Sequence, residues 1–179
     1  VTIFHPDSIR DNPHVPPIVF TDFRITNKSV VPGTLNSPLK QSITEAKEIT
    51  LSYLDNVFSF EFAALDYTMP AKNQYAYKLE GFDKDWIRSG NVNTATYTNL
   101  DPGKYTFRVK GSNNDGLWNE QGASVTIIIT PPWWKTTWAY IAYVLLAGTL
   151  LYGIYRVRMN RLQLAHQLRR FDVDRILFF

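Results

Sequence analysis

The chain has 179 residues, 45% of them hydrophobic and 15% aromatic, which is enough to build a core and unlike a disordered composition. It has no cysteine, and this excludes disulfides, thiol nucleophiles and cysteine-containing zinc sites. Residues 1–132 hold 12 Lys/Arg against 14 Asp/Glu, whereas residues 133–179 hold 7 Lys/Arg against 2 Asp. Because the cations gather outside the predicted folded part, we predict no nucleic-acid partner.

The N-terminal residues 1–14 are rich in His, Asp and Asn, and we interpret them as the end of a preceding domain. They contain no basic segment followed by an apolar one, so no signal peptide is predicted, and an exported chain would have to be cut from a longer one. The following Val-Pro-Pro at 15–17 is expected to form a stiff linker, because consecutive prolines hold the backbone extended.

From residue 18 to residue 130, short strands with one apolar face alternate with turns. In VFSFEFAAL, for example, Phe58, Phe60 and Phe62 share one face. About seven such strands in roughly 115 residues are typical of a β-sandwich. We therefore predict an all-β domain over 15–132, an immunoglobulin/fibronectin-like antiparallel β-sandwich. The strands are expected in IVFTDFRI, EITLSYL, VFSFEFAAL, QYAYKLEG, GKYTFRVKG and ASVTIIIT.

A local motif near the end of this region supports the same fold. Pro102 and Gly103 form a turn, and Tyr105 enters the strand that follows. In sandwiches of this class a tyrosine at such a corner hydrogen-bonds back across it, so we predict that role for Tyr105. The stretch GSNNDGLWNEQG is then expected to be a hairpin loop, with Asp115-Gly116 as its tight turn.

An uncharged run of 20 residues, 136–155, follows the β-region. As a helix it would be about 30 Å long, the thickness of the hydrocarbon core of a bilayer. Trp133 and Trp134 stand at its start and Tyr155 at its end, where indole and phenol rings favour the headgroup level. The alternative, a core helix of a soluble domain, is disfavoured because the run has no polar stripe. We predict a single transmembrane helix over 133–156.

Arginines crowd the C-terminal side of this run, which predicts a cytoplasmic C-terminus and a β-domain on the other side of the membrane. The same arginines would be drawn to anionic lipids, so the bilayer is a predicted partner. Residues 157–179 are predicted as a cytoplasmic juxtamembrane helix that ends as if cut. The spacing of Leu164, Leu168 and Phe171 fits either a short coiled-coil seam or a plain continuation of the membrane helix.

No catalytic, cofactor or metal site is predicted. His5, His14 and His166 are far apart in the sequence and form no ligand pattern. The pair Asp83 and Asp85 is interpreted as part of a solvated turn rather than as an acid/base pair. The stretch NNDGLWNE lacks the alternating ligands and the closing Glu of a calcium loop.

Two tryptophans are candidates for a ligand-binding face. Trp86 and Trp118 have the flat apolar rings that stack on sugars. The competing interpretation is that they belong to the core, as most aromatic side chains do in a sandwich of this size.

The sequence as a whole resembles a known combination of domains. NQYAYKLEGFDKDWIRSGNVNTATYTNLDPGKYTFRVKGSNNDGLW resembles the Y_Y_Y domain, a sandwich named for three tyrosines. TPPWW before the apolar run resembles the junction that follows this domain in bacterial periplasmic-sensing two-component regulators. FHPDSIRDNPHVPPIVFTDF resembles the passage from their β-propeller sensor, so the resemblance covers essentially 1–160. The matching positions of the motif are Tyr77 or Tyr75, Gly81, Trp86, Tyr97 and Tyr105.

In such proteins, propeller blades outside the inner membrane bind a ligand, often an oligosaccharide. A histidine kinase follows inside the cell, or a diguanylate cyclase in some relatives. The resemblance therefore implies that this chain is a signal-relay segment, without enzyme activity of its own, of a homodimeric inner-membrane receptor. RRFDVDRILFF does not show the H-E-x-x-x-P kinase box, so the output enzyme is only implied.

The segment expected to couple the β-domain to the membrane helix is Pro131, Pro132, Trp133 and Trp134. A two-proline joint passes on a displacement that a Gly/Ser tether would lose. The alternative function is a membrane-anchored module whose sandwich itself binds a carbohydrate or a protein.

Overall fold

The computed structural model describes residues 11–35 and 37–176, with side chains as far as Leu164. It consists of two compact units, Val1–Pro131 and Pro132–Phe179, which are described separately below. Most of the predicted end of a preceding domain, residues 1–10, lies outside the described residues. The side chains of the predicted seam residues Leu168 and Phe171 lie outside them too.

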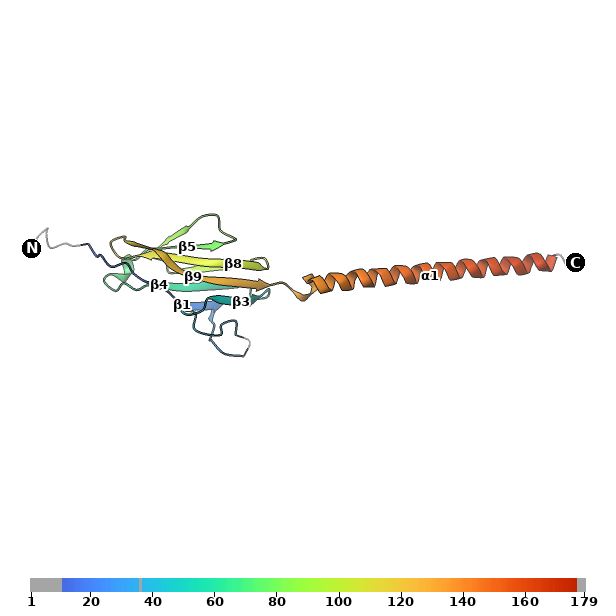
Figure 1. Cartoon of the computed structure of the whole chain (residues 1–179), viewed down its shortest axis with the longest axis horizontal. Helices are drawn as coiled ribbons and strands as arrows, with labels where there is room; N and C mark the ends of the chain where they lie inside the picture. Colours follow the sequence, from blue (N-terminus) through green and yellow to red (C-terminus); the bar gives the residue numbers. More distant parts are fainter. Residues whose placement is uncertain (1–10, 36, 177–179) are drawn as a thin grey trace, which may run out of the picture. The chain divides into compact units, whose positions relative to one another are not determined.

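The first unit is a β-sandwich, as predicted (Figure 1). Its two sheets are hydrogen-bonded in the orders β2-β1-β4-β7 and β3-β9-β8-β5-β6. The described strands of the first sheet are β1 (Ile18–Ile25), β2 (Lys28–Ser29), β4 (Val57–Ala64) and β7 (Thr94–Thr98). Those of the second are β3 (Glu48–Ser52), β5 (Tyr75–Glu80), β6 (Ile87–Gly90), β8 (Gly103–Ser112) and β9 (Trp118–Thr130), with a 3-10 turn η2 at Pro70–Lys72.

One strand pairing departs from a purely antiparallel sandwich. β3 runs parallel to β9, with Glu48 opposite Thr126 and Ser52 opposite Thr130. The turn after β3 carries the chain across to the other sheet, where β4 pairs with β1 and β7. Two strands that are neighbours in sequence therefore lie in different sheets, and β3 is left to close the edge of the second sheet.

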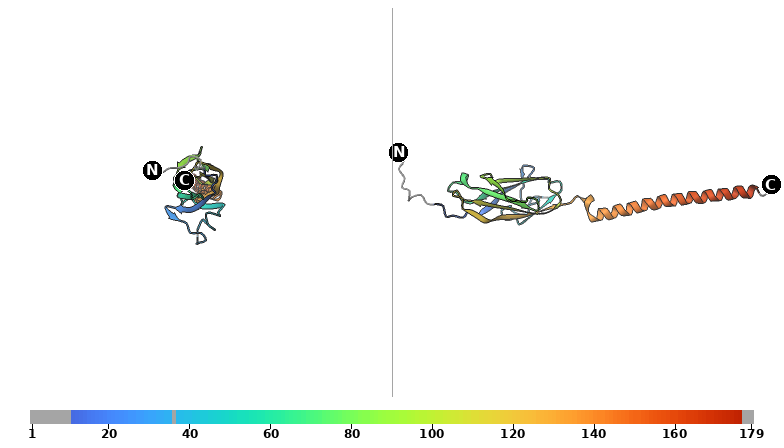
Figure 2. Two further views of the ribbon diagram at one scale, coloured as in Figure 1. Left: turned by 90° about the vertical axis from the view of Figure 1, so that its left-hand side faces the viewer. Right: turned by 90° about the horizontal axis from the view of Figure 1, so that it is seen from above.

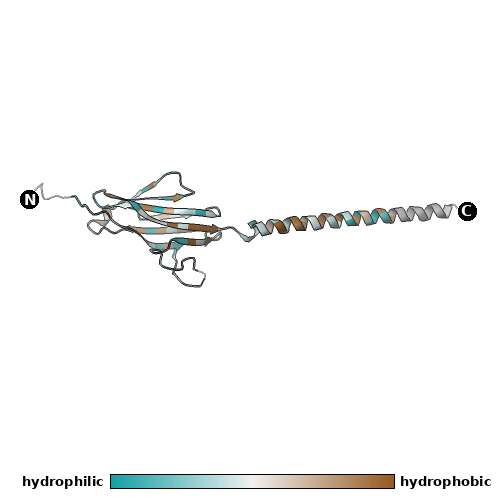
Figure 3. Cartoon of the chain, in the orientation of Figure 1, coloured by the Kyte–Doolittle hydropathy of each residue, from teal (hydrophilic) through white to brown (hydrophobic). Residues whose placement is uncertain are grey.

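Alternating side chains form the core between the sheets, as the sequence pattern predicted; Figure 3 shows the alternation along the strands. Phe58, Phe60 and Phe62 of β4 are all buried against the second sheet. The rings of Phe60 and Phe107 stack with centroids 4.6 Å apart and planes 9° from parallel. Such stacking adds to the hydrophobic gain from burying the rings.

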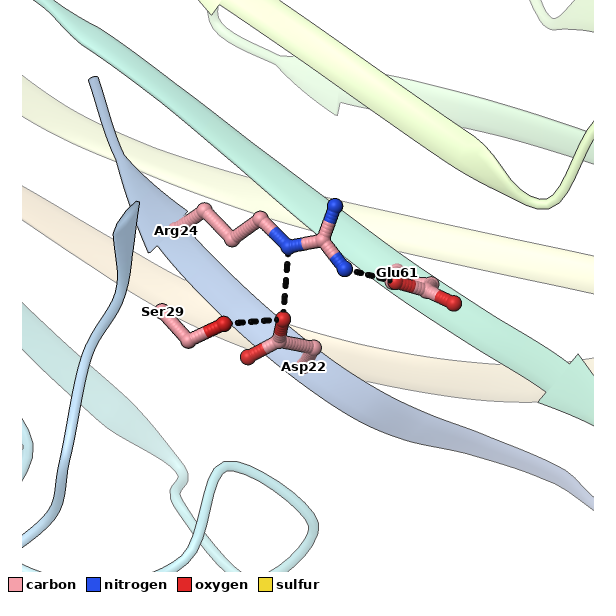
Figure 4. Close-up of polar contacts among 4 residues, drawn as sticks. All are labelled: Asp22, Arg24, Ser29 and Glu61. Atoms are coloured by element: carbon pink, nitrogen blue, oxygen red, sulfur yellow. Dashed lines mark hydrogen bonds and ion pairs between the residues drawn. The ribbon is translucent and has the colours of Figure 1, made fainter. Parts of the chain in front are cut away.

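A polar network on the outer side of the first sheet ties β1, β2 and β4 together (Figure 4). Arg24 donates to Asp22 through Nε at 2.6 Å and to Glu61 through Nη2 at 2.6 Å, and the Ser29 hydroxyl donates to Asp22 at 2.7 Å. Burial alone would raise the pKa of Asp22. The hydrogen bonds from Ser29 and Arg24 outweigh it and hold that pKa below its usual value.

The second unit begins with a 3-10 turn, η3 (Trp133–Lys135), and continues as one helix, α1 (Thr137–Ile176). The prediction that the helix starts at residue 133 was wrong, because Thr136 has extended backbone angles and separates the turn from the helix. The predicted helix after residue 156 is confirmed as far as Ile176, as an unbroken continuation of the same helix (Figure 2). Residues Thr137–Leu164 form a stretch of helix long and apolar enough to span a membrane. Its most apolar 18 residues have a mean hydropathy of 1.5, and none of them is buried.

Candidate functional site

Two of the motif tyrosines tie the two sheets together. The hydroxyl of Tyr97, on β7 of the first sheet, donates to Asp83 Oδ2 at 2.7 Å, in the turn after β5 of the second. In the opposite direction, Tyr75 of β5 accepts from the backbone N–H of Ala64 at 3.1 Å, at the end of β4. Because each bond links one sheet to a strand or turn of the other, the tyrosines fix how one sheet lies on the other.

The interpretation of Asp83 as part of a solvated turn was incomplete, because its carboxylate has two hydrogen-bond partners within the sandwich. Besides accepting from Tyr97, its Oδ2 accepts from the backbone N–H of Leu79 at 2.7 Å. The residues do form a turn, as expected, with Phe82 and Asp83 both donating through their backbone N–H to the Leu79 carbonyl. The carboxylate thus holds the turn after β5 to the phenol of β7, which makes it a structural anchor.

Tyr105 makes the corner hydrogen bond predicted for it. Its hydroxyl donates to the carbonyl of Asp101 at 2.9 Å. Gly81 lies against the same ring with φ +95°, and a Cβ there would stand 3.1 Å from Tyr105 Cδ1. Glycine is therefore required at 81 both by its backbone angle and by the contact with the ring.

Tyr97 gives the stability of the sandwich an alkaline limit. Burial, and then the hydrogen bond to Asp83, raise the pKa of this phenol above its usual value. The unfolded chain would lose the proton near pH 10, before the folded chain does, so stability should fall as pH rises above about 10. Tyr97→Phe is expected to cost about 1 kcal/mol at neutral pH and to flatten this fall. The part of the alkaline fall in stability that persists in this variant would come from Tyr77, whose pKa is also raised by burial.

Denaturant unfolding of the wild type and the variant between pH 7 and 11 measures this difference. Tyr67→Phe serves as the control, because Tyr67 is 79% exposed. An alkaline decline that is the same in the Tyr97→Phe variant and in the wild type would rule out this role of Tyr97.

The entry segment, residues 11–17, is held to the sandwich by its backbone carbonyls. The buried side chain of Asn113 donates through Nδ2 to the carbonyls of Asn12 at 2.8 Å and His14 at 2.9 Å. Asn119 donates to the carbonyl of Pro16 at 2.9 Å. The backbone N–H of Leu65 donates to the next carbonyl, that of Pro17, at 2.9 Å.

The chemistry of the entry segment explains this arrangement. It contains three prolines, at 13, 16 and 17, which have no N–H to donate. The segment therefore cannot pair as an ordinary strand, and it offers mainly acceptors. Side-chain amides such as those of Asn113 and Asn119 supply the matching donors.

Asn12 adds a second set of contacts to the same attachment. Its side-chain amide donates to Asp66 Oδ2 at 2.6 Å and to Asn114 Oδ1 at 2.9 Å. Asp66 is itself buried, and its Oδ1 accepts from the backbone N–H of Thr68 at 2.9 Å. This backbone hydrogen bond is the main cause that lowers the pKa of Asp66, so the carboxylate stays ionised as an acceptor.

The sequence reasoning missed Asn113, Asn119 and Asp66. The stretch around Asn113 was correctly predicted as a tight turn, and Gly116 has φ +83° there. To predict the attachment, the turn has to be considered together with the proline-rich segment about 100 residues earlier. A stretch that offers mainly carbonyls, together with asparagines next to a turn, is the pattern that would have pointed to it.

β9 connects the attachment of the entry segment with the end of the sandwich. It runs for 13 residues from Trp118 to Thr130, a length of about 43 Å at the usual rise of a strand. Near its start Asn119 holds Pro16, and at its end the Thr130 hydroxyl donates to the carbonyl of Leu51 at 3.1 Å. It is paired with β8 from Trp118 to Ile129, with a register shift before Ala123, and with β3 on the other side at Thr126–Thr130 only.

The predicted coupling residues follow directly. The chain leaves β9 at Thr130, passes Pro131 and Pro132, and enters η3 at Trp133. Pro132 has extended backbone angles, φ −62° and ψ 148°. Within the second unit, the rings of Trp133 and Trp134 meet edge to face at 5.6 Å. The Trp134 carbonyl accepts from the Tyr143 hydroxyl of α1 at 3.4 Å, so the turn is bound to the first part of the helix.

The two candidate ligand-binding tryptophans lie around one pocket of about 210 Å³ on the second sheet. Lys110 lies close to both, with Nζ 4.8 Å from the ring centroid of Trp86 and 5.7 Å from that of Trp118. Neither ring is buried, so both lie outside the core. The pocket is lined by Ala76, Trp86, Arg88, Lys110, Trp118 and Glu120.

No reaction chemistry is evident in the part of the chain that the structure describes. No group of three or more His, Asp or Glu side chains there is placed to hold a metal ion. What the described geometry supplies is a set of fixed attachments at the two ends of one strand.

Comparison with known proteins agrees with this geometry. Residues 66–130, which include Tyr75, Tyr97 and Tyr105, match the Y_Y_Y domain family. The β-sandwich contains a Y_Y_Y domain. The match begins at Asp66, and it ends at Thr130, the last residue of β9.

The relatives of this Y_Y_Y segment include sensor proteins. Histidine kinase P4 of Formosa agariphila is 36% identical over 175 residues, which are 98% of this chain and 13% of that protein. The extracellular domain of the hybrid two component system BT4673 from B. thetaiotaomicron is 35% identical, with a TM-score of 0.58 over 66% of this chain and 16% of that one. That of BT3049 from the same organism is 32% identical, with a TM-score of 0.54 over 72% of this chain and 17% of that one. The chain thus spans less than a fifth of each relative.

Proposed function

We propose that this chain is the relay segment of a transmembrane sensor. It receives a displacement from a sensory domain through the entry segment and passes it along β9 to the membrane helix. The observation that carries this proposal is that one strand joins both attachments. Asn119, near its start, holds Pro16, and Thr130, at its end, precedes the two prolines. The likeness to a histidine kinase and to extracellular domains of hybrid two component systems supports it.

The physical basis of the proposal is stiffness. β9 is paired with β8 at Trp118, Asn119 and from Ala123 to Ile129, and its last five residues, Thr126–Thr130, are paired with β3 as well. Such pairing resists lengthening of an already extended strand, so we expect a pull at Pro16 to act along β9. Two consecutive prolines then limit the rotation of the backbone where the strand ends. A flexible tether at either point would let the displacement disappear into conformational freedom.

The proposed setting is the bacterial inner membrane, with the β-domain in the periplasm and the C-terminus in the cytoplasm. The apolar helix supports the crossing, and the arginines after it support the direction. The further partners we propose are a propeller-like sensor before the sandwich, with an oligosaccharide as its ligand, and a second copy of the chain. The output domain would be a histidine kinase or a diguanylate cyclase, and this segment itself would not be an enzyme.

Inserting a Gly/Ser segment of about 12 residues between Thr130 and Pro131 of the full receptor is expected to abolish ligand-dependent output. The insert leaves the sandwich and the helix intact and removes only the stiff connection. Ligand-stimulated autophosphorylation in membrane vesicles measures the effect.

The same insert in the exposed loop after Val31, which is 61% exposed, is the matched control and is expected to leave signalling unchanged. If signalling survives the insert before Pro131, the sandwich does not act through a stiff joint.

The direction of crossing has its own test, which the absence of cysteine makes simple. Lys104→Cys in β8 and Gln163→Cys in α1 introduce single thiols at exposed positions. Gln163 follows the arginines that come after the uncharged run 136–155, so the two thiols lie on the two proposed sides. A membrane-impermeant maleimide added to spheroplasts is expected to label the first and not the second. Labelling of Gln163→Cys alone would reverse the topology, and labelling of both would contradict the crossing.

A further inference from the structure

The pocket between Trp86 and Trp118 is built on one row of side chains across the second sheet. Ala76 of β5 lies opposite Arg88 of β6 and opposite Lys110 of β8. Residues directly opposite each other point to the same face of a sheet, so the three side chains share the outer face. Because alanine is small, it leaves a depression between the two long cationic side chains, and its own side chain is covered, at 1% exposed.

Lys110 is fixed in the wall of this pocket. Its ammonium is 2.8 Å from Glu120 Oε2 and also contacts the rings of Trp86 and Trp118. These three partners hold the side chain, which is only 20% exposed. Cation–π contacts of this kind orient the rings relative to the charge. The indoles of Trp86 and Trp118 are therefore both held close to the same ammonium.

Arg88 is the cation that remains available. Lys110 is neutralised by Glu120, whereas Arg88 forms no ion pair among the residues that the structure describes. Its side chain is exposed at the rim of the pocket. A guanidinium presents a planar fork of donors that matches a carboxylate or a sulfate.

We propose that this pocket binds a pyranose that carries an anionic substituent, a carboxylate or a sulfate ester, within an acidic polysaccharide. The apolar face of the ring stacks on Trp86 or Trp118, and the anion is bound by Arg88. Lys110 and Glu120 donate to and accept from the ring hydroxyls. Each chemical feature of such a sugar then has a counterpart in the pocket.

The size and charge of the pocket favour this occupant. A volume of about 210 Å³ is smaller than the roughly 300–1,000 Å³ of pockets for drug-sized ligands, so it suits one ring at a time. Two cations and one carboxylate leave it net positive, which favours an acidic over a neutral sugar. A neutral sugar would leave the guanidinium without an anionic partner.

This site goes beyond the relay function, because it lies on the sandwich itself. Trp118 is the first residue of β9, and its neighbour Asn119 holds Pro16 of the entry segment. A sugar bound there would contact the start of the strand through which the displacement is proposed to pass. Binding can nevertheless be measured without any signalling readout, so the two proposals fail independently.

The test is isothermal titration of the complete 179-residue chain, in lipid nanodiscs at low salt, with three sugars. Trigalacturonate carries carboxylates, its methyl ester has the same rings without charge, and neocarrabiose 4-sulfate carries a sulfate. We expect binding of one or both anionic sugars and about tenfold weaker binding of the ester. If only trigalacturonate binds, the anionic group that the pocket recognises is a carboxylate. If only the sulfated disaccharide binds, it is a sulfate ester.

Variants locate the site. Arg88→Gln, Trp86→Ala and Trp118→Ala are each expected to weaken binding about tenfold or more. Arg108→Gln is the matched control, because Arg108 is two residues from Lys110 on the same strand and is paired with Glu80; its binding should stay within about twofold of the wild type. Thermal unfolding of each variant verifies that it is folded.

Three results would overturn the proposal. The first is no binding of either anionic sugar, and the second is measurable binding of both trigalacturonate and its ester with equal affinity. The third is a loss of self-association of the chain in the Trp86→Ala variant by sedimentation, without any effect on sugar binding. That result would assign the face to a second copy of the chain.

Discussion

Replacing Phe107 with alanine is expected to lower the free energy of unfolding of the β-sandwich by about 3–5 kcal/mol. The side chain is fully buried and stacks on Phe60 at 4.6 Å. Its ring also meets those of Tyr77 and Tyr97, so the lost volume is surrounded by rigid aromatic side chains that cannot collapse into it. The cost of such a cavity is at the upper end of the usual range when its walls cannot move.

Urea unfolding followed by tryptophan fluorescence measures this cost, since Trp86 and Trp118 both lie in the sandwich. Phe82→Ala is the matched control, because Phe82 is 56% exposed, and its cost should stay below about 1 kcal/mol. Equal losses for the two variants would mean that Phe107 does not organise the core.

Replacing Asn113 with alanine is expected to cost about 2–4 kcal/mol and to release the entry segment. The amide of Asn113 is buried and donates to two backbone carbonyls of that segment. Its carbonyl oxygen accepts from the backbone N–H groups of Asp115, at 3.0 Å, and Leu117, at 2.9 Å. Alanine removes all four bonds, and because they are partly buried, water replaces them only incompletely.

Hydrogen exchange followed by mass spectrometry detects the release, as faster exchange in peptides that contain residues 11–20. Asn91→Ala supplies the control, because Asn91 lies in an exposed turn, and it should change stability by no more than about 0.5 kcal/mol. If exchange in the entry segment is unchanged in Asn113→Ala, the segment is held by something other than this side chain. The first step of the proposed relay would then have no structural basis.

These two variants separate stability from attachment. Phe107→Ala weakens the sandwich as a whole, and Asn113→Ala is expected to act most strongly where the chain enters it. In the full receptor, a comparison of their signalling at a temperature where both remain folded would distinguish loss of the domain from loss of its connection.

The strands and the core were largely predictable, because they depend on local alternation. The expected strands at IVFTDFRI, VFSFEFAAL, QYAYKLEG and GKYTFRVKG are all present, with Phe58, Phe60 and Phe62 buried together. The short strands β6 and β7 were missed, because IRSG and TATYT have too few apolar residues for the alternation to register. They become strands because β5 and β4 offer them free edges.

The sequence by itself determined which residues face the core, that an apolar helix long enough for a membrane follows the sandwich, and that the Tyr105 hydroxyl bonds back across its own turn. These depend on residues close together in the chain, whose periodicity and turn chemistry are local. Only the tertiary structure decided that Asp83 binds Tyr97, that β3 runs parallel to β9, and that Asn113 holds a segment 101 residues away. In each case the hydrogen-bond donor and acceptor are far apart in the sequence. They meet only because folding brings particular strand edges and loop ends together.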